Sequence, residues 1–220
     1  MSRSRIRVIN PNSNRVVTKA LEDALKPLTF ANGPEIVCET LDEGPHGIES
    51  QADADSVVMP LRRLVEGDNR SAAFVIACYS DPGLHVCREA TERPVFGIAE
   101  CGVLTALSRA ENFGVIAIGQ RSIRRHIRYL RQMQLLDRMV GERPINMSVA
   151  DTASGDATLT RMIEVGHTLK NEDGAQAVVM GCAGMARHRA ALEQALGIPV
   201  IDPTQAAVTM AFGAVQFAGH

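Results

Sequence analysis

Two cysteines stand at the ends of two matching apolar runs of this 220-residue chain. Cys78 follows the run AFVIA at 73–77, and Cys182 follows AVVMG at 177–181. Small, turn-forming residues come directly after each cysteine. A thiolate and a thiol on opposite sides of one molecule can remove a proton from a carbon beside a carbonyl and return a proton to the other face. The pattern therefore favours inversion at an acidic carbon, with no metal or organic cofactor required.

The similarity of the two segments extends to their neighbours in the sequence. PVFG at 94–97 aligns with PVID at 199–202, and RVI at 7–9 aligns with GVI at 114–116, at nearly the same offset. The chain thus reads as two similar halves with one thiol in each. If the halves face one another across a cleft, the two thiols can act on opposite faces of one bound molecule.

Composition limits the class of protein. Hydrophobic residues make up 45% of the chain, enough for a full core without disulfide support. The net charge of −2 gives no general attraction to nucleic acid or to an anionic membrane, so we expect a small-molecule substrate as the partner. The odd count of five cysteines and the lack of a signal-peptide or membrane-spanning run predict reduced thiols in the cytoplasm.

Short β-branched runs alternate with helix-length segments, which is typical of parallel sheets built from βαβ units. Strands are expected near 6–9, 35–40, 73–77, 94–97, 113–118, 145–150, 176–181 and 199–201. The predicted fold class is α/β, with two similar lobes related by a pseudo-two-fold axis. Each lobe is a parallel four-stranded sheet flanked by helices, and the active site lies in the cleft between the lobes. Residues 1–98 with 203–220 form the first lobe and 99–202 the second, with the last helix, 204–217, returning to the first lobe.

In such sheets, ligands bind outside the carboxyl ends of the strands. That rule brings several loops to one crevice and yields a set of candidate substrate-binding residues: Asn10, Ser80, Gly83, Gly119, Gln120, Ala183 and Gly184. Helix N-termini after Cys78 and Cys182 are expected to lower the pKa of each thiol. The same backbone amides would stabilise negative charge on a substrate carbonyl.

The remaining reactive side chains carry weaker signals. We expect Cys38, Cys87 and Cys101 to be structural, and no pair of histidines has metal-ligand spacing. Five arginines between 121 and 131 recur every three or four residues, which favours a solvated or subunit-facing stripe over a nucleic-acid surface. The loop at 44–49 is either a flap over the cleft or a solvated connection. Glu100 either orients a group in the site or caps a helix.

These motifs resemble those of a known family. ACYSDPGL at 77–84 and GCAGM at 181–185 look like the paired cysteine motifs of the hydantoin and allantoin racemases, within the aspartate/glutamate racemase superfamily. Supporting segments are INPNS at 9–13, PVFGIAE at 94–100 and PVIDP at 199–203. The resemblance implies a two-lobed, cofactor-independent racemase in which Cys78 and Cys182 are the acid/base pair. It also implies a homo-oligomer.

Two departures from related sequences bear on the substrate. Amino-acid racemases of the superfamily typically follow their cysteines with Asn-Thr and Thr-His, whereas this chain has Tyr79-Ser80 and Ala183-Gly184. The loss of polar groups suited to a zwitterion favours a neutral cyclic ureide such as a 5-substituted hydantoin or allantoin. Many hydantoin racemases carry hydroxyls where this chain has IAIGQ at 116–120. The alternatives are an amino-acid racemase, a maleate-type cis-trans isomerase, and a small-molecule binding protein without turnover.

Overall fold

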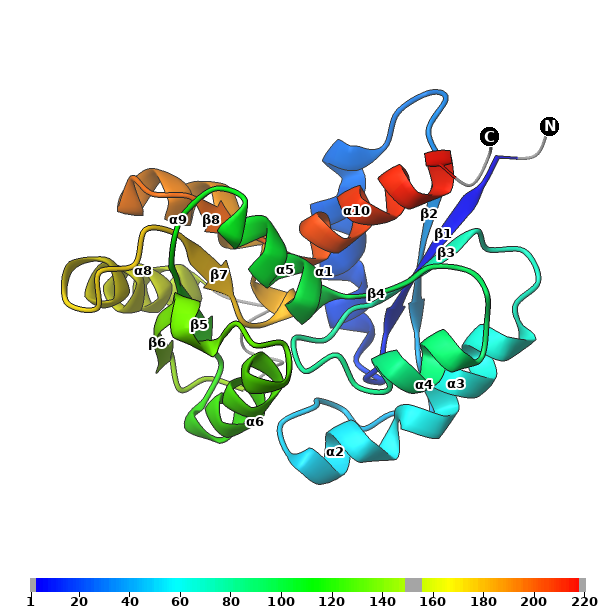
Figure 1. The fold of residues 1–220 in the computed structure, drawn as a ribbon, viewed down its shortest axis with the longest axis horizontal. Coiled ribbons are helices and arrows are strands. Elements are labelled where there is room, and N and C mark those ends of the chain that lie inside the picture. The colour runs from blue at the N-terminus through cyan, green and yellow to red at the C-terminus, as the bar shows by residue number, and fades with distance from the viewer. Residues whose placement is uncertain (1–2, 149–155, 218–220) are drawn as a thin grey trace.

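Two parallel sheets, each of four strands, form the two lobes of the molecule (Figure 1). The computed structural model describes residues 3–148 and 156–217. The strand order is β2-β1-β3-β4 in the first lobe and β6-β5-β7-β8 in the second. Strands from matching parts of the two halves therefore occupy the same place in each sheet. The predicted α/β fold with two similar parallel lobes is confirmed.

The central strands are apolar because helices cover both faces of each sheet. β3 and β5 are buried along their whole length. The first sheet consists of β1 (Arg5–Asn10), β2 (Glu35–Thr40), β3 (Ala73–Ile76) and β4 (Val95–Gly97). The second sheet consists of β5 (Phe113–Ala117), β6 (Met139–Pro144), β7 (Val178–Met180) and β8 (Val200–Ile201).

Two helices of the first lobe begin at side chains that cap them. Asn14 accepts a hydrogen bond from the Val16 N–H at the start of α1, and Ser50 and Asp53 form a capping box at α2. The α-helices are α1 (Arg15–Leu25), α2 (Gln51–Ser56), α3 (Val58–Gly67), α4 (Leu84–Glu89), α5 (Ile98–Leu107), α6 (Gln120–Gln132), α8 (Asp156–Asn171), α9 (Arg189–Leu196) and α10 (Pro203–Phe217). The 3₁₀ segments are η1 (Lys26–Leu28), η2 (Leu136–Arg138) and η3 (Ala183–His188).

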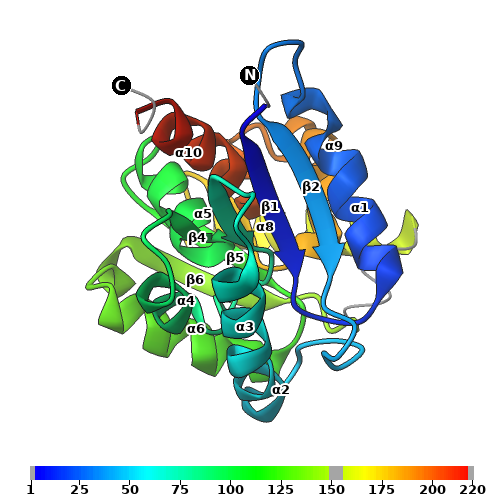
Figure 2. The same cartoon turned by 90° about the vertical axis from the view of Figure 1, so that its right-hand side faces the viewer.

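One hydrophobic core joins the lobes. Its buried residues include Val8 and Val75 from the first sheet and Val115 and Val179 from the second. α1 packs against η3 of the second lobe, and in Figure 2 β1 and β2 run between α10 and α1. α10 contacts α5 as well as β1, β3 and β4, so it belongs to the junction. The exact lobe boundaries stay a prediction.

The strand expected at 145–150 is wrong. The fourth strand of the second sheet is β6, Met139–Pro144, which pairs in parallel with β5. β6 is an edge strand that contains a glycine, two charged residues and a proline, so it lacks the apolar run that marks the central strands. The backbone beyond it still follows β5, because the Ile145 N–H donates to the Ala117 carbonyl over 2.9 Å. Positions 149–150 lie outside the described residues.

Within the described ranges, no helix is long and apolar enough to cross a membrane.

Candidate active site

Cys78 lies in the turn that follows β3. The Asp81 N–H donates to the Cys78 carbonyl over 2.9 Å, which closes the turn. The backbone N–H of Ser80 donates to the Cys78 sulfur. Asp81 fixes this turn to α5, because its carboxylate accepts the N–H groups of Ala99 and Glu100 at the start of that helix, at 2.9 Å each. The thiol is thereby held at the carboxyl end of its strand, as the sequence pattern predicts.

Cys182 occupies the matching place in the second lobe, at the N-terminus of η3. Gly181 precedes it, and a Cβ there would lie 2.6 Å from the carbonyl oxygen of Ile116, so only glycine lets the backbone pass so close to β5. α1 of the first lobe packs on η3 and brings the two strand ends toward one another. Cys182 is 8% exposed.

Both thiols line one cavity between the lobes. The space between its walls is about 420 Å³, and this volume includes the open mouth of the cavity. Its wall comes from the first lobe through Cys78, Tyr79 and Ser80 and from the second through Cys182, Ala183 and Gly184, among others. Of the substrate-binding residues predicted from the sequence, Ser80, Ala183 and Gly184 therefore lie together at the cavity.

The other four predicted binding residues do not line this cavity. Asn10 is buried behind it, where its Nδ2 donates to Oδ1 of Asn12 over 3.0 Å, and Asn12 lines the cavity instead. Gly83 begins α4 with a φ of 69° and faces a neighbouring pocket. Gly119 and Gln120 lie at the start of α6, outside the cavity wall. Asn10 therefore contacts a residue of the cavity wall without lining the cavity itself.

Several residues that line the cavity were not predicted from the sequence. Ile48, from the loop at 44–49, is 5% exposed and lines the cavity, so part of this loop covers the site. Arg125 and His126 of α6 also line it. The arginine stripe is indeed exposed at Arg121 and Arg124, but Arg125 is 8% exposed and points inward. Ser122 and His126 of the same helix are buried beside it.

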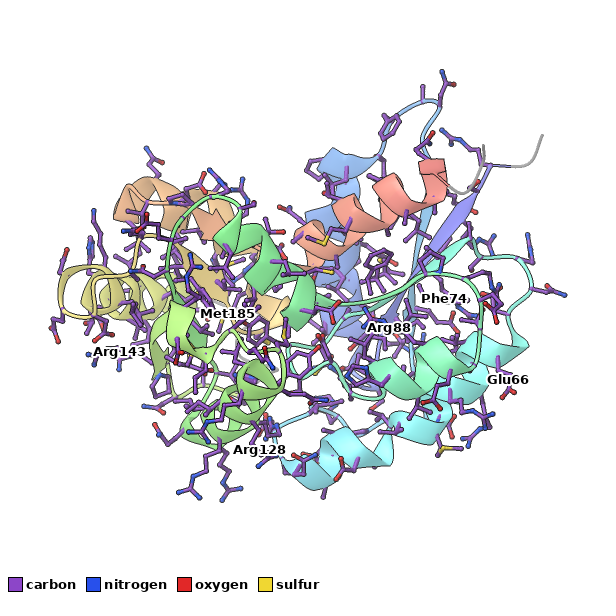
Figure 3. All side chains as sticks on the ribbon, viewed as in Figure 1. Glu66, Phe74, Arg88, Arg128, Arg143 and Met185 are labelled. Atoms are coloured by element: carbon purple, nitrogen blue, oxygen red, sulfur yellow. The ribbon has the colours of Figure 1, made fainter. Side chains whose placement is uncertain are left out.

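Arg125 connects the lobes. Its Nε donates to Oγ of Ser80 over 3.4 Å, and its Nη1 donates to the carbonyl of Glu49 over 3.1 Å. Both acceptors belong to the first lobe, whereas α6 belongs to the second. On the same helix, Arg128 donates to Oε1 of Gln51 at the start of α2. Figure 3 labels Arg128 where α6 approaches α2.

His126 is held at the cavity by a buried carboxylate. Its Nδ1 lies 2.5 Å from Oε1 of Glu142 on β6, and both side chains are at most 5% exposed. The ring of Tyr79 meets the His126 ring edge to face, with centroids 4.9 Å apart. This contact also crosses between the lobes and fixes the imidazole beside the turn that carries Cys78.

The environment of Cys78 opposes its ionisation. Burial raises the pKa of the Cys78 thiol to about 12, and negative charge on Cys182 contributes in the same direction. The Ser80 N–H and the positive charge of Arg125 lower the pKa. The expected lowering by a helix N-terminus is wrong for Cys78, because the loss of hydration outweighs these favourable contacts. Because a negative charge on one sulfur disfavours a charge on the other, the pair can hold one thiolate beside one thiol.

The remaining thiols and Glu100 lie outside the cavity wall. Cys87 and Cys101 are buried within α4 and α5, and burial raises the pKa of Cys87 to about 11. Cys38 lies on β2, where burial raises its pKa to about 12. Glu100, in the first turn of α5, forms an ion pair of 2.8 Å with Arg88. Within the described ranges, no group of three His, Cys, Asp or Glu side chains could hold a metal ion.

Known proteins of one family match this chain over nearly its whole length. A family model described as Asp/Glu/Hydantoin racemase matches residues 6–211. The hydantoin racemase of Pseudomonas sp. (strain NS671) is 36% identical over 210 residues, covering 94% of this chain and 84% of that protein. The hydantoin racemase of Paenarthrobacter aurescens is also 36% identical, with 94% and 89% covered. The structure of allantoin racemase from Klebsiella pneumoniae matches with a TM-score of 0.93 at 28% identity, over 98% of this chain and 89% of that chain. By sequence and by fold, this chain belongs to the Asp/Glu/Hydantoin racemase family.

Proposed function

We propose that the protein is a cofactor-independent racemase that inverts a carbon next to a carbonyl in a 5-substituted hydantoin or an allantoin-like cyclic ureide. Cys78 and Cys182 are its acid/base pair. The observation that carries the proposal is that the two thiols reach one cavity from opposite lobes. A planar ring bound between them presents one face to each sulfur.

The reaction needs one proton transfer at each face. The thiolate of one cysteine removes the proton from the ring carbon, and the electron pair moves onto the neighbouring carbonyl to form an enolate. The thiol of the other cysteine then donates a proton to the opposite face and becomes the thiolate. The two cysteines exchange these roles when the other enantiomer is the substrate. General acid–base catalysis of this kind contributes about 10²- to 10⁴-fold, so orientation and enolate stabilisation supply the rest.

The groups of the cavity wall suit the binding of a neutral ring better than that of a zwitterion. Ala183 and Gly184 follow Cys182 with no side-chain hydrogen-bonding group, which leaves their backbone N–H groups as donors to a ring carbonyl. Val17, Ile48 and Ile118 add apolar surface. The relatives at 36% identity are named hydantoin racemases, which agrees with this choice.

One observation favours an acidic amino acid as the alternative substrate. Arg125 brings a positive charge to the cavity, and such a charge also suits the carboxylate of an acidic amino acid. Aspartate and glutamate therefore belong in any test of the substrate.

The test follows deuterium at the reacting carbon. Separate enantiomers of several 5-substituted hydantoins, allantoin, aspartate and glutamate are incubated in D₂O with protein dialysed against a chelator, beside enzyme-free blanks. NMR measures deuterium entry, and chiral chromatography measures interconversion. We expect both enantiomers of a hydantoin or of allantoin to gain deuterium and reach a 1:1 mixture.

Other outcomes separate the alternatives. Turnover of aspartate or glutamate alone would replace the cyclic ureide with an amino acid. Thermal stabilisation by a ureide without deuterium entry would indicate a binding protein and end the proposal. The variant C38S is the control for cysteine substitution, because Cys38 lies on β2 and not on the cavity wall, and it should keep the wild-type rate.

A further inference from the structure

Arg125 is a buried positive charge, and among the described residues it has no ion-pair partner. It is 8% exposed, and its hydrogen bonds go to two neutral oxygens, Oγ of Ser80 and the carbonyl of Glu49. Among the residues that the structure describes, none of the ion pairs includes Arg125. The charges of Asp53 and Glu142 act on Arg125 only from beyond ion-pair distance, and burial outweighs them and lowers the pKa of Arg125. Such a residue is best explained by an anion that forms beside it.

The group placed to become that anion is the sulfur of Cys78. Arg125 and Cys78 line the same cavity, and Ser80 contacts both of them. The Oγ of Ser80 accepts from Nε of Arg125, while the Ser80 N–H donates to the Cys78 sulfur. The interaction is mutual, because the charge of Arg125 favours the thiolate and the thiolate favours the charged guanidinium.

We propose that Arg125 is a positioning residue whose buried positive charge stabilises the thiolate of Cys78. The inference rests on the proposed function, since it assumes that Cys78 acts as an acid/base thiol. The charges balance through the reaction. When the Cys78 thiolate takes the proton from carbon, the negative charge passes through the enolate to Cys182, which has given up its own proton. Arg125 therefore favours the state in which Cys78 is the base.

The same residue makes ionisation depend on the approach of the lobes. Arg125 comes from α6 in the second lobe, whereas Cys78, Ser80 and the Glu49 carbonyl belong to the first. Arg128, labelled in Figure 3, holds the same helix to Gln51 of α2. A separation of the lobes would take the guanidinium away from the sulfur. The contact that favours the Cys78 thiolate is thus one that joins the two lobes.

Other charged and titratable groups face this pair from each neighbouring element. They are Asp81 in the Cys78 turn, Cys182 at η3, Asp53 on α2, His126 and Arg128 on α6, and Glu142 on β6. Among them, Asp81 and Cys182 raise the pKa of Cys78. Arg125 is the cation that lowers it.

The experiment measures the ionisation of Cys78 directly and does not depend on turnover. The full-length protein is treated with iodoacetamide across a pH series, and mass spectrometry follows alkylation of the peptide that contains Cys78. The variants are R125M and R125Q, which remove the charge, and R125K, which keeps it. R124M is the control, because Arg124 is an exposed arginine on the same helix. Circular dichroism checks that each variant is folded.

We expect the alkylation rate of Cys78 at neutral pH to fall roughly tenfold in R125M and R125Q, which corresponds to a midpoint higher by about one pH unit. R125K should stay within about half a unit of the wild type, and R124M should not move. The acid limb of the kcat/KM profile should move up with the midpoint in the two neutral variants. If R125M and R125Q do not fold, R125K still decides, because a midpoint displaced by about a full unit despite the retained charge would overturn the proposal.

Two results would overturn the inference while leaving the proposed function intact. One is an unchanged midpoint in a folded neutral variant. The other is a higher KM with an unchanged midpoint, which would mean that Arg125 binds an anionic substrate. Full racemase activity in C78S would instead refute the role of Cys78, and the alkylation midpoint would still report on the charge interaction by itself.

Discussion

A buried carboxyl at the junction of the lobes shows how single residues set the pH dependence of stability. Asp202 is 2% exposed and accepts the N–H of Thr204 over 2.8 Å at the start of α10. Its second oxygen, Oδ2, is buried with no hydrogen-bond partner among the described residues. Burial raises the pKa of Asp202 from 3.8 to about 6. The folded protein therefore holds this proton more tightly than the unfolded chain does.

This predicts a gain of stability for D202N that grows with pH. The contribution of a group with a raised pKa is fully present below about pH 4 and is lost as the pH rises through about 6. Asparagine mimics the neutral acid at every pH. Denaturant unfolding at pH 4 and pH 8 should show D202N gaining up to about 3 kcal/mol on the wild type at the higher pH. The exposed Asp137→Asn is the control, and an equal gain there, or none in D202N, would contradict this interpretation.

At the same scale, the sequence predicts those site residues that directly follow a recognisable strand. Apolar runs precede Cys78, Cys182, Ser80 and Gly184. Because ligands bind at the carboxyl ends of parallel strands, this position alone predicts that the four residues share one site. Arg125 was missed because its inward position depends on the other lobe, and within its own helix it appears as one arginine among five.

Helix α1 shows at the scale of an element how packing positions the site. It contacts β2, η3 and α10, so it links the lobes behind the two cysteines. Leu21 is fully buried on its inner face, whereas Val16 is 55% exposed on its outer face. The amphipathic pattern of the sequence is enough to predict the helix but not which lobe covers it.

We predict that L21A lowers the free energy of unfolding by about 2–5 kcal/mol, because it leaves a cavity at this junction. V16A, on the same helix, should change the free energy of unfolding by less than about 0.5 kcal/mol. Urea titration followed by circular dichroism measures both. Equal effects of the two substitutions would show that α1 does not contribute a buried face as described.

Among the strands, the error at β6 has a different origin from the missed arginine. Central strands are covered by helices and read as continuous apolar runs, whereas an edge strand carries charges, glycine and proline without penalty. The sequence therefore predicted the strands that carry an apolar or β-branched run, the edge strand β2 included, and displaced the one strand without such a run. The register of β6 matters for the site, because Glu142 on this strand holds His126.

For the whole molecule, the repeated strand order was predictable, and the closure of the lobes over the cavity was not. The aligned halves imply two equivalent sheets, and the structure has them. The contacts that cross between the lobes, such as Arg125 with the Glu49 carbonyl and Tyr79 with His126, join segments with no shared sequence signal. The homo-oligomer and the cytoplasmic location stay predictions.

The central claim is that two thiols, one from each lobe, act on opposite faces of one carbon. The most direct test incubates C78S and C182S with each enantiomer of the identified substrate in D₂O and follows both deuterium entry and interconversion. We predict that neither variant interconverts the enantiomers. The thiol that remains should exchange the proton of one enantiomer alone, and the favoured enantiomer should be opposite in the two variants. Interconversion at the wild-type rate in either variant, or exchange of the same enantiomer in both, would contradict the account.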